Sequence, residues 1–98
     1  MKPVAHLSDA NLEMVEAALW YDRRESGLGE RLLQAIAAAQ FKIQNNPQLG
    51  TPHRRGTRKW RVLKFPYRIV YREEADRILV VAIAHDKRRE NYWDHRLD

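Results

Sequence analysis

The chain has 98 residues, of which 44% are hydrophobic and 32% are charged. This length suffices for one core, and the composition excludes disordered, fibrous and low-complexity classes. There is no cysteine, so disulfides, cysteine zinc sites and thiol nucleophiles are excluded. No apolar run approaches the ~20 residues of a membrane span. We therefore expect a single domain over residues 1–98, located in the cytoplasm and without a membrane partner.

The formal charge of +5 is unevenly distributed along the chain. Residues 1–49 sum to −1 and residues 50–98 to +6, and no acidic residue lies between Arg31 and Arg72. A basic block of this kind repels itself unless something negative lies opposite. The candidates are nucleic acid, an anionic membrane and an acidic protein.

The first half of the chain predicts a strand and two helices. Residues 3–7 are expected to form the strand, and Ser8 with Asp9 the N-cap of a helix that ends near residues 25–27. A second helix over about 30–44 ends at Asn45-Asn46-Pro47, and the short link between the helices implies an antiparallel hairpin. The buried face of the first helix is expected to hold Leu12, Met14, Val15, Ala18, Leu19 and Tyr21. The stripe of the second is expected to hold Leu28, Leu32, Ala35, Ile36, Ala39 and Ile43.

The second half predicts strands. After a loop over 47–58, strands are expected at 60–65, 67–72 and 78–84, with a turn at 73–76 and a short helical turn within 90–97. The strand at 78–84 is apolar on both faces, which is typical of a central strand. The fold class is therefore α+β: an N-terminal strand and an antiparallel helical hairpin packed on one face of a small, mainly antiparallel sheet. The other face is expected to be exposed and to carry Arg61 or Arg68.

Several kinds of chemistry are absent from the sequence. It has no Gly-rich phosphate loop and no GxSxG elbow. The four histidines lack metal-ligand spacing, so we expect neither a metal nor another cofactor. What remains is a set of cations with a histidine and several tyrosines near strands. Such cations repel one another unless a phosphate lies among them, and the arginine fork binds phosphate oxygens well.

RNA cleavage is one chemistry that these residues could perform. Attack of a 2′-hydroxyl on its own phosphate needs a base, an acid and cations. Arg68 and Arg88 are the candidates for charge stabilisation and His85 for proton transfer. Tyr92 could act as a base only beside cations, and stacking on a nucleobase is an equally good role for it. The structural alternatives are that His85 is a hydrogen-bonded strand-end histidine and that Tyr92 and Trp93 pack the C-terminal turn onto the sheet.

Other cations are candidates for contacts with the RNA backbone rather than for chemistry. Those in the Gly/Pro loop are expected to form a solvated patch that attracts phosphate. The full candidate set is Arg54, Arg55, Arg61, Lys64, Lys87 and Arg89.

Two segments, FPYRIVY and AHDKRRENYW, carry a resemblance that extends over nearly the whole chain. The chain resembles the RelE/ParE superfamily of toxins from type II toxin–antitoxin modules, including members described as plasmid-stabilisation proteins. The resemblance implies the fold given above, a cytoplasmic location and a cognate antitoxin. We expect that antitoxin to be acidic and encoded next to the toxin.

The superfamily resemblance implies two mechanisms. RelE-like members are ribosome-dependent endoribonucleases, or mRNA interferases, and they match this chain at Arg68, Arg88 and Tyr92. Their two upstream lysines have only Arg61 and Lys64 as counterparts here, at a different spacing. ParE-like members poison DNA gyrase and have no known nuclease chemistry. The sequence favours mRNA cleavage on the ribosome, with gyrase inhibition or an inactive antitoxin-binding protein as alternatives.

Overall fold

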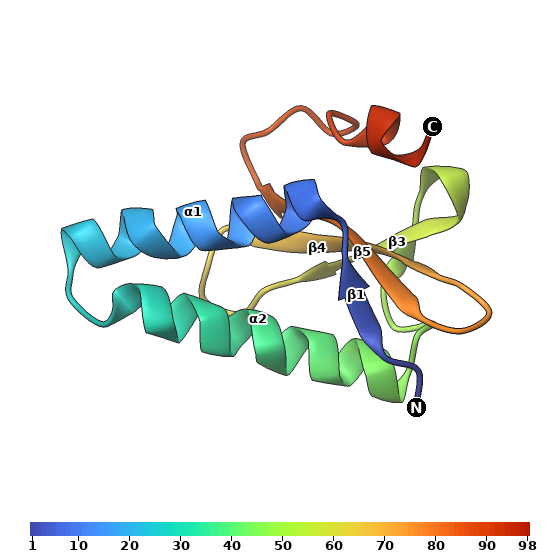
Figure 1. Ribbon diagram of the computed structural model, residues 1–98, viewed down its shortest axis with the longest axis horizontal. Coiled ribbons are helices and arrows are strands. Elements are labelled where there is room, and N and C mark those ends of the chain that lie inside the picture. Colours follow the sequence, from blue (N-terminus) through green and yellow to red (C-terminus); the bar gives the residue numbers. More distant parts are fainter.

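The computed structural model describes residues 1–98 and consists of two long helices beside a five-stranded sheet (Figure 1). This arrangement confirms the expected α+β fold, with an N-terminal strand, a helical hairpin and a sheet. The elements in chain order are β1 (Val4–His6), α1 (Ser8–Arg24), α2 (Leu28–Asn45), β2 (Thr51–Pro52), the 3-10 helix η1 (Arg54–Gly56), β3 (Thr57–Arg61), β4 (Tyr67–Glu73), β5 (Ile78–His85) and the 3-10 helix η2 (Asp94–Leu97).

The strands follow the order β1-β5-β4-β3-β2 across the sheet. β1 is parallel to β5, with Val4 opposite Ile78, and all other pairs are antiparallel. β5 thus has a strand on each side, which confirms the central position that its apolar composition predicts. Neither helix combines the length and the apolar character needed to cross a lipid bilayer.

The link between the two helices depends on close backbone approach. The Gly29 N–H donates to Asp22 Oδ1 over 2.7 Å, which caps the first turn of α2. A Cβ atom on Gly29 would lie 2.3 Å from the Ala18 carbonyl oxygen, so only glycine fits between the helices here. Gly27, with φ of 89°, reverses the chain direction just before α2.

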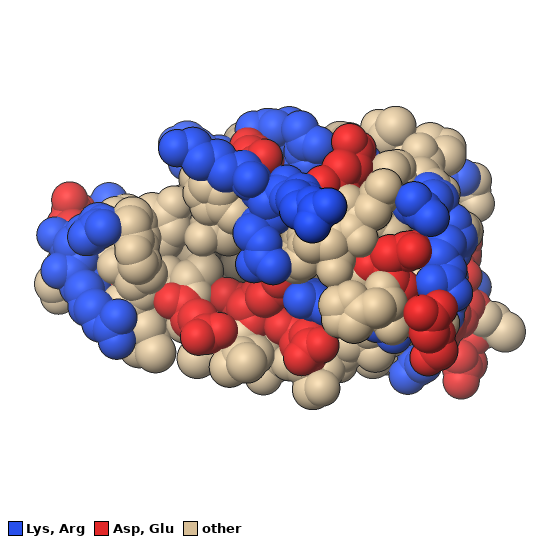
Figure 2. Space-filling model, turned by 90° about the horizontal axis from the view of Figure 1, so that it is seen from above, with Lys and Arg blue, Asp and Glu red and all other residues tan.

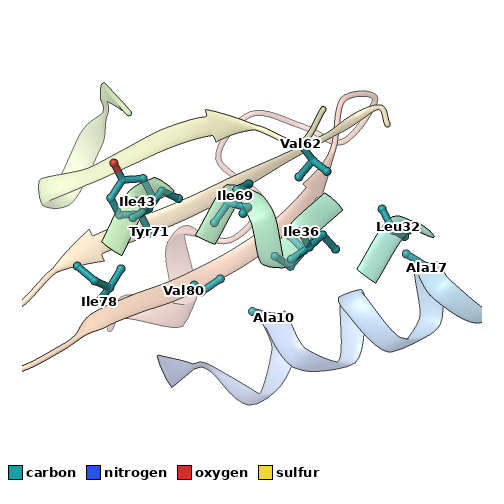
Figure 3. Packing of buried hydrophobic residues seen from close by; sticks show 12 residues of the cluster. Ala10, Ala17, Leu32, Ile36, Ile43, Val62, Ile69, Tyr71, Ile78 and Val80 are labelled. Carbon is teal, nitrogen blue, oxygen red and sulfur yellow. The ribbon is translucent and has the colours of Figure 1, made fainter. Parts of the chain in front are cut away.

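The face of the sheet covered by the helices holds the main core (Figure 3). The expected stripe of α2 lies against it, and Tyr71 of β4 is fully buried. The Tyr71 hydroxyl donates to the Pro47 carbonyl at 2.9 Å and accepts from the Gly50 N–H at 2.8 Å. These bonds tie the loop after α2 to the middle of the sheet. The fully buried side chains here include Leu32, Ile36, Ile43, Ile69, Ile78 and Val80.

The opposite face of the sheet is partly covered by the C-terminal segment, residues 86–98. Trp93 is fully buried there against Val70, Leu79, Val81 and Ala82. Figure 1 shows α2 and the C-terminal segment on opposite sides of the strands. The prediction that this face is exposed was therefore wrong in its central part, whereas the packing role of Trp93 is confirmed.

Two further expectations about the sheet need correction. The strand predicted at 60–65 is β3 at Thr57–Arg61, and residues 62–66 form a turn in which Lys64 has φ of 70°. The turn begins where the Val62 N–H donates to the Tyr67 carbonyl at 3.0 Å. Strand β2 lies inside the predicted loop. Two residues have too short a pattern to be recognised without their partner strand.

The buried face of α1 also differs from the expected one. Leu12, Val15 and Leu19 are exposed at 54%, 43% and 50%, although they were assigned to the core. Ala10 and Ala17 are buried in their place. The small alanines allow α1 to lie close to α2 and β5, and this close packing turns the larger apolar side chains outward.

Candidate functional site

Arg61 and Arg68, two of the predicted functional arginines, lie opposite each other on β3 and β4. Like charges in such a position repel each other. Asp86, just after β5, lies between them, with Oδ2 at 3.6 Å from Arg61 Nη2 and Oδ1 at 3.5 Å from Arg68 Nε. The Asp86 N–H also donates to the Pro66 carbonyl at 2.8 Å, which fixes the position of this carboxylate. The two arginines therefore converge, but on a carboxylate of the same chain.

Tyr92 is held by a carboxylate. Its hydroxyl donates to Glu13 Oε2 over 2.6 Å, and the Arg88 guanidinium lies 3.9 Å from the centre of its ring. Burial, followed by the hydrogen bond to Glu13, raises the pKa of Tyr92 well above its usual value near 10. The sequence-based proposal of Tyr92 as a base required neighbouring cations to lower this pKa. Arg88 and Arg96 lie beside the ring and act to lower the pKa, but burial and the hydrogen bond to Glu13 outweigh them, and this geometry does not favour a base role.

Glu13 of α1 is the centre of the contacts that hold the C-terminal segment. Besides the Tyr92 hydroxyl, it accepts two hydrogen bonds from Arg96, at 2.9 and 3.0 Å, and one from the Ile83 N–H at 3.1 Å. Arg96 also donates to the Val81 carbonyl at 3.0 Å. The Arg96 side chain is only 9% exposed. Neither residue was singled out from the sequence, because nothing in the helical pattern of residue 13 indicates a partner 83 positions away.

His85 ends β5 as a hydrogen-bonded strand-end histidine. Its Nδ1 accepts the Lys87 N–H at 3.0 Å, which leaves the ring proton of the neutral form on Nε2. The ring packs edge-on to Tyr67 with 5.1 Å between the centroids. His85 therefore offers one donor to a ligand. Lys87 and Arg89 are exposed beside it and have no carboxylate within 4 Å.

Arg54 and Arg55, two of the predicted RNA contacts, pair with the C-terminal segment. Arg55 Nη1 donates to Asp98 Oδ1 and to the Asp94 carbonyl, each at 2.9 Å, and Arg54 Nε lies 3.4 Å from Asp94 Oδ1. The partner Asp98 raises the pKa of Arg55 by accepting its hydrogen bond. These two arginines are therefore used within the fold and lie apart from Arg68 and Arg88.

The remaining predicted residues divide between two places. Arg68, His85, Arg88 and Arg89 line one small cavity of about 100 Å³ on the C-terminal face of the sheet. Lys64 and Arg61 instead border a cavity of about 720 Å³ beside α2. The structure thus brings together one cluster of cations around His85, and it leaves Lys64 outside that cluster.

The cavity beside α2 continues into a second one of about 690 Å³, and the two form a single groove. Its floor is apolar and includes Ala35 and Phe65, which line both parts. Leu63, in the turn after β3, is 67% exposed at its edge. The basic side chains that border this α2 groove are Arg31, Lys42, Arg61 and Lys64.

Comparison with known proteins agrees with this architecture. A solved structure described as a chromosomal ParDE TA system from P. aeruginosa matches with a TM-score of 0.65 and 16% sequence identity, over 87% of this chain and 96% of that one. At this identity the likeness concerns the fold alone. No curated protein matches the chain by sequence.

The family model described as "ParE toxin of type II toxin-antitoxin system, parDE" matches residues 8–90, from the start of α1 to just beyond the His85 cluster. This match and the fold define the protein as a type II toxin. The chain belongs to the ParE toxin family, and as a toxin of such a system it has an antitoxin partner.

Proposed function

We propose that this ParE-family toxin stops growth by binding DNA gyrase and does not cut mRNA. The position of Tyr92 is the observation that carries the proposal. A ribonuclease of the RelE type would need a group at this position that can transfer a proton or lie against RNA. Here the hydroxyl is bound to Glu13 and the ring is covered by Arg88. The match to ParE toxins favours the same conclusion, because the ParE-like branch acts on gyrase.

The shared carboxylate of Asp86 also supports a binding mechanism. A phosphate entering between Arg61 and Arg68 would have to displace a charge that is already present and covalently part of the chain. Two guanidiniums compensated in this way give less stabilisation to charge that develops in a transition state. They remain able to contact a protein surface, because Arg61 and Arg68 are 63% and 43% exposed.

The test is to compare two readouts after the chain is expressed without its antitoxin. Supercoiling by purified gyrase should be inhibited, and mRNA 5′ ends should show no new cleavages. The matched variant is Tyr92→Phe, which keeps the ring beneath Arg88 and removes the hydroxyl. It should still inhibit gyrase. New mRNA 5′ ends that disappear in Tyr92→Phe would establish the nuclease instead, and no effect on growth would identify an inactive antitoxin-binding protein.

The α2 groove is the proposed docking site for the antitoxin. Its apolar floor with basic side chains around it fits a segment with apolar residues inside and acidic residues outside. Such a partner is consistent with the charge of +6 on residues 50–98. The product of the neighbouring reading frame should be captured by the wild-type chain and lost with Leu63→Asp. Leu12→Asp, an equally polar change at an exposed position on α1, should retain capture.

A further inference from the structure

Another cavity, of about 390 Å³, lies between α1 and the adjoining ends of β4 and β5. This volume is within the ~300–1,000 Å³ of ordinary small-molecule sites. Three of its walls are the aromatic rings of Trp20, Tyr21 and Tyr67, and we call it the aromatic cavity. The ring centroids of Trp20 and Tyr21 are 5.0 Å apart, and those of Tyr21 and Tyr67 are 6.4 Å apart, all at steep angles. Tyr21 also lines the α2 groove, whereas neither the gyrase proposal nor that groove uses the rings of Trp20 and Tyr67.

The aromatic cavity adjoins the small cavity on the C-terminal face of the sheet. Both are lined by His85 and Arg88, so these two side chains form the boundary between them. Within the small cavity, Lys59 is paired with Glu90, and Arg68 with Asp86. Arg88 and Arg89 have no carboxylate within 4 Å, which leaves two uncompensated guanidiniums in a cavity that His85 also lines. This arrangement favours a dianion of phosphate size.

The opposite wall of the aromatic cavity is acidic. Glu13 is occupied by Tyr92 and Arg96, but Glu16, one turn further along α1, has no hydrogen bond or ion pair. Figure 2 looks onto this side of the molecule and shows acidic side chains along α1 and basic side chains facing them across a hollow. A ligand that fits both walls must carry an anionic end and an end rich in N–H donors, with a flat apolar part between them.

From these walls we infer that the two cavities together bind a 5′-nucleotide, with the base in the aromatic cavity and the phosphate at Arg88 and Arg89. Aromatic rings stack on any nucleobase. The Glu16 carboxylate selects among bases, because a carboxylate accepts two parallel N–H donors best. Guanine presents such a pair on its Watson–Crick edge, cytosine and adenine present one amino group, and uracil presents a single ring N–H. The expected order of affinity is therefore guanine first and uracil last.

Other ligands fit the walls less well. A lysine or arginine side chain from a partner would suit Glu16 and the rings, but it would meet Arg88 in the same cavity. The Trp20 ring already has a cation over it, the Arg24 guanidinium at 3.6 Å from its centre. A wholly apolar ligand would leave Glu16 and Arg88 desolvated without partners. The nucleotide could be a free metabolite or the terminal nucleotide of a nucleic acid, since both present the same groups.

The test is titration calorimetry of the purified toxin, without gyrase or antitoxin, against GMP, CMP, UMP, guanosine and ribose 5-phosphate. GMP should bind most tightly, and UMP, guanosine and ribose 5-phosphate should each bind at least tenfold more weakly. Glu16→Gln should weaken the binding of GMP about tenfold, since one charge-assisted hydrogen-bond pair is lost. It should also reduce the difference in affinity between GMP and UMP. Arg89→Gln should weaken all the phosphate-bearing ligands by a similar factor. Because gyrase is absent from the assay, a failure of the toxin to bind nucleotide would not count against the gyrase proposal.

Matched control variants distinguish an effect at the two cavities from an effect of the net charge of the protein. Asp76→Asn, in the exposed turn between β4 and β5, and Arg23→Gln, at the end of α1, make the same charge changes away from both cavities and should leave GMP affinity unchanged. A short single strand with a 5′-phosphorylated terminal guanosine tests the source: tighter binding than GMP identifies nucleic acid, and equal binding identifies the free nucleotide. The inference is overturned if no nucleotide binds at millimolar concentration, if ribose 5-phosphate binds as well as GMP, or if Glu16→Gln and Asp76→Asn behave alike.

Discussion

The two faces of the sheet are stabilised in different ways. The face beneath the helices is packed with aliphatic side chains from α1, α2 and three strands, and few polar contacts cross it (Figure 3). The opposite face has one large side chain, Trp93, and depends otherwise on hydrogen bonds and ion pairs from Glu13, Arg96 and Arg55. Apolar packing tolerates small adjustments, whereas each charged contact fails when either partner is removed. The candidate cations Arg68, Arg88 and Arg89 lie on the polar side of this comparison, whereas Tyr21 and Tyr67 of the aromatic cavity pack against the helix-side core.

Removal of Trp93, the single large side chain on the C-terminal face, should have the largest effect on the free energy of unfolding. Trp93→Ala should lower the free energy of unfolding by about 4 kcal/mol, because a fully buried indole leaves a large cavity. Ile36→Ala, on the helix face, should cost about 3 kcal/mol by the same mechanism. Urea unfolding followed by circular dichroism measures both. In hydrogen exchange, Trp93→Ala should reduce amide protection mainly in residues 86–98, whereas Ile36→Ala should reduce it throughout the sheet. Equal, global loss in both variants would show that the two faces form one cooperative unit.

Glu13→Ala tests the charged anchor of the C-terminal segment. It leaves the Arg96 guanidinium, 9% exposed, without its main partner, and we expect a loss of about 3 kcal/mol. Glu16→Ala removes the same charge one turn along α1, where it has no partner, and should change stability by less than about 0.5 kcal/mol. The comparison uses thermal or urea unfolding of both variants. A cost for Glu16→Ala as large as that for Glu13→Ala would contradict the anchoring role.

The dependence of stability on pH should come from the helix face in mildly acid solution. Burial lowers the pKa of His6, whose Nε2 lies 2.7 Å from Gln40 Nε2. The unfolded state therefore binds the proton more readily, so stability should fall as pH falls through about 6.5, the ordinary histidine value. The lowered carboxyl pKa values of Glu74 and Glu90 act only below about 4.5. The melting temperature of His6→Gln should change less than that of the wild type between pH 7.5 and 5.5. Equal changes in both proteins would exclude His6 as the cause of the pH dependence.

The smallest expected effect concerns the exposed ion pairs of Asp86. Asp86→Asn should cost about 0.5 kcal/mol, since Arg61 and Arg68 are well exposed and screened by water. The loss should shrink as salt is raised from 0.05 to about 1 M, because salt then screens the repulsion between the two arginines. A loss that does not change with salt would mean that Asp86 acts through its backbone hydrogen bond instead.

Most of the secondary structure was readable from residue patterns. The helical hairpin, the strands β4 and β5 and the central position of β5 follow from periodicity and from breakers such as Gly27 and Pro47. The turn over residues 62–66 could not be predicted in this way, because Val62, Leu63 and Phe65 are apolar and continue the strand pattern. The outward face of α1 also escaped prediction, since alanines at 10 and 17 give a weak apolar signal although they permit the closest packing.

The candidate site was predictable in its residue types and much less in its arrangement. Arg68, which the sequence places inside a strand, does line one cavity together with His85 and Arg88 from the end of the last strand. Their partners Glu13 and Asp86 were not predictable as such, because contacts between residues distant in the chain leave no local pattern.

The sequence by itself determined the α+β class, the order of the elements and the concentration of positive charge in the second half, because each depends on local periodicity or simple composition. Only the tertiary structure decided which cations are compensated and which are free. Whether Arg88 has a carboxylate partner, and what the Tyr92 hydroxyl donates to, depends on groups that folding brings within a few ångströms. Electrostatic energy depends on those distances rather than on separation along the chain.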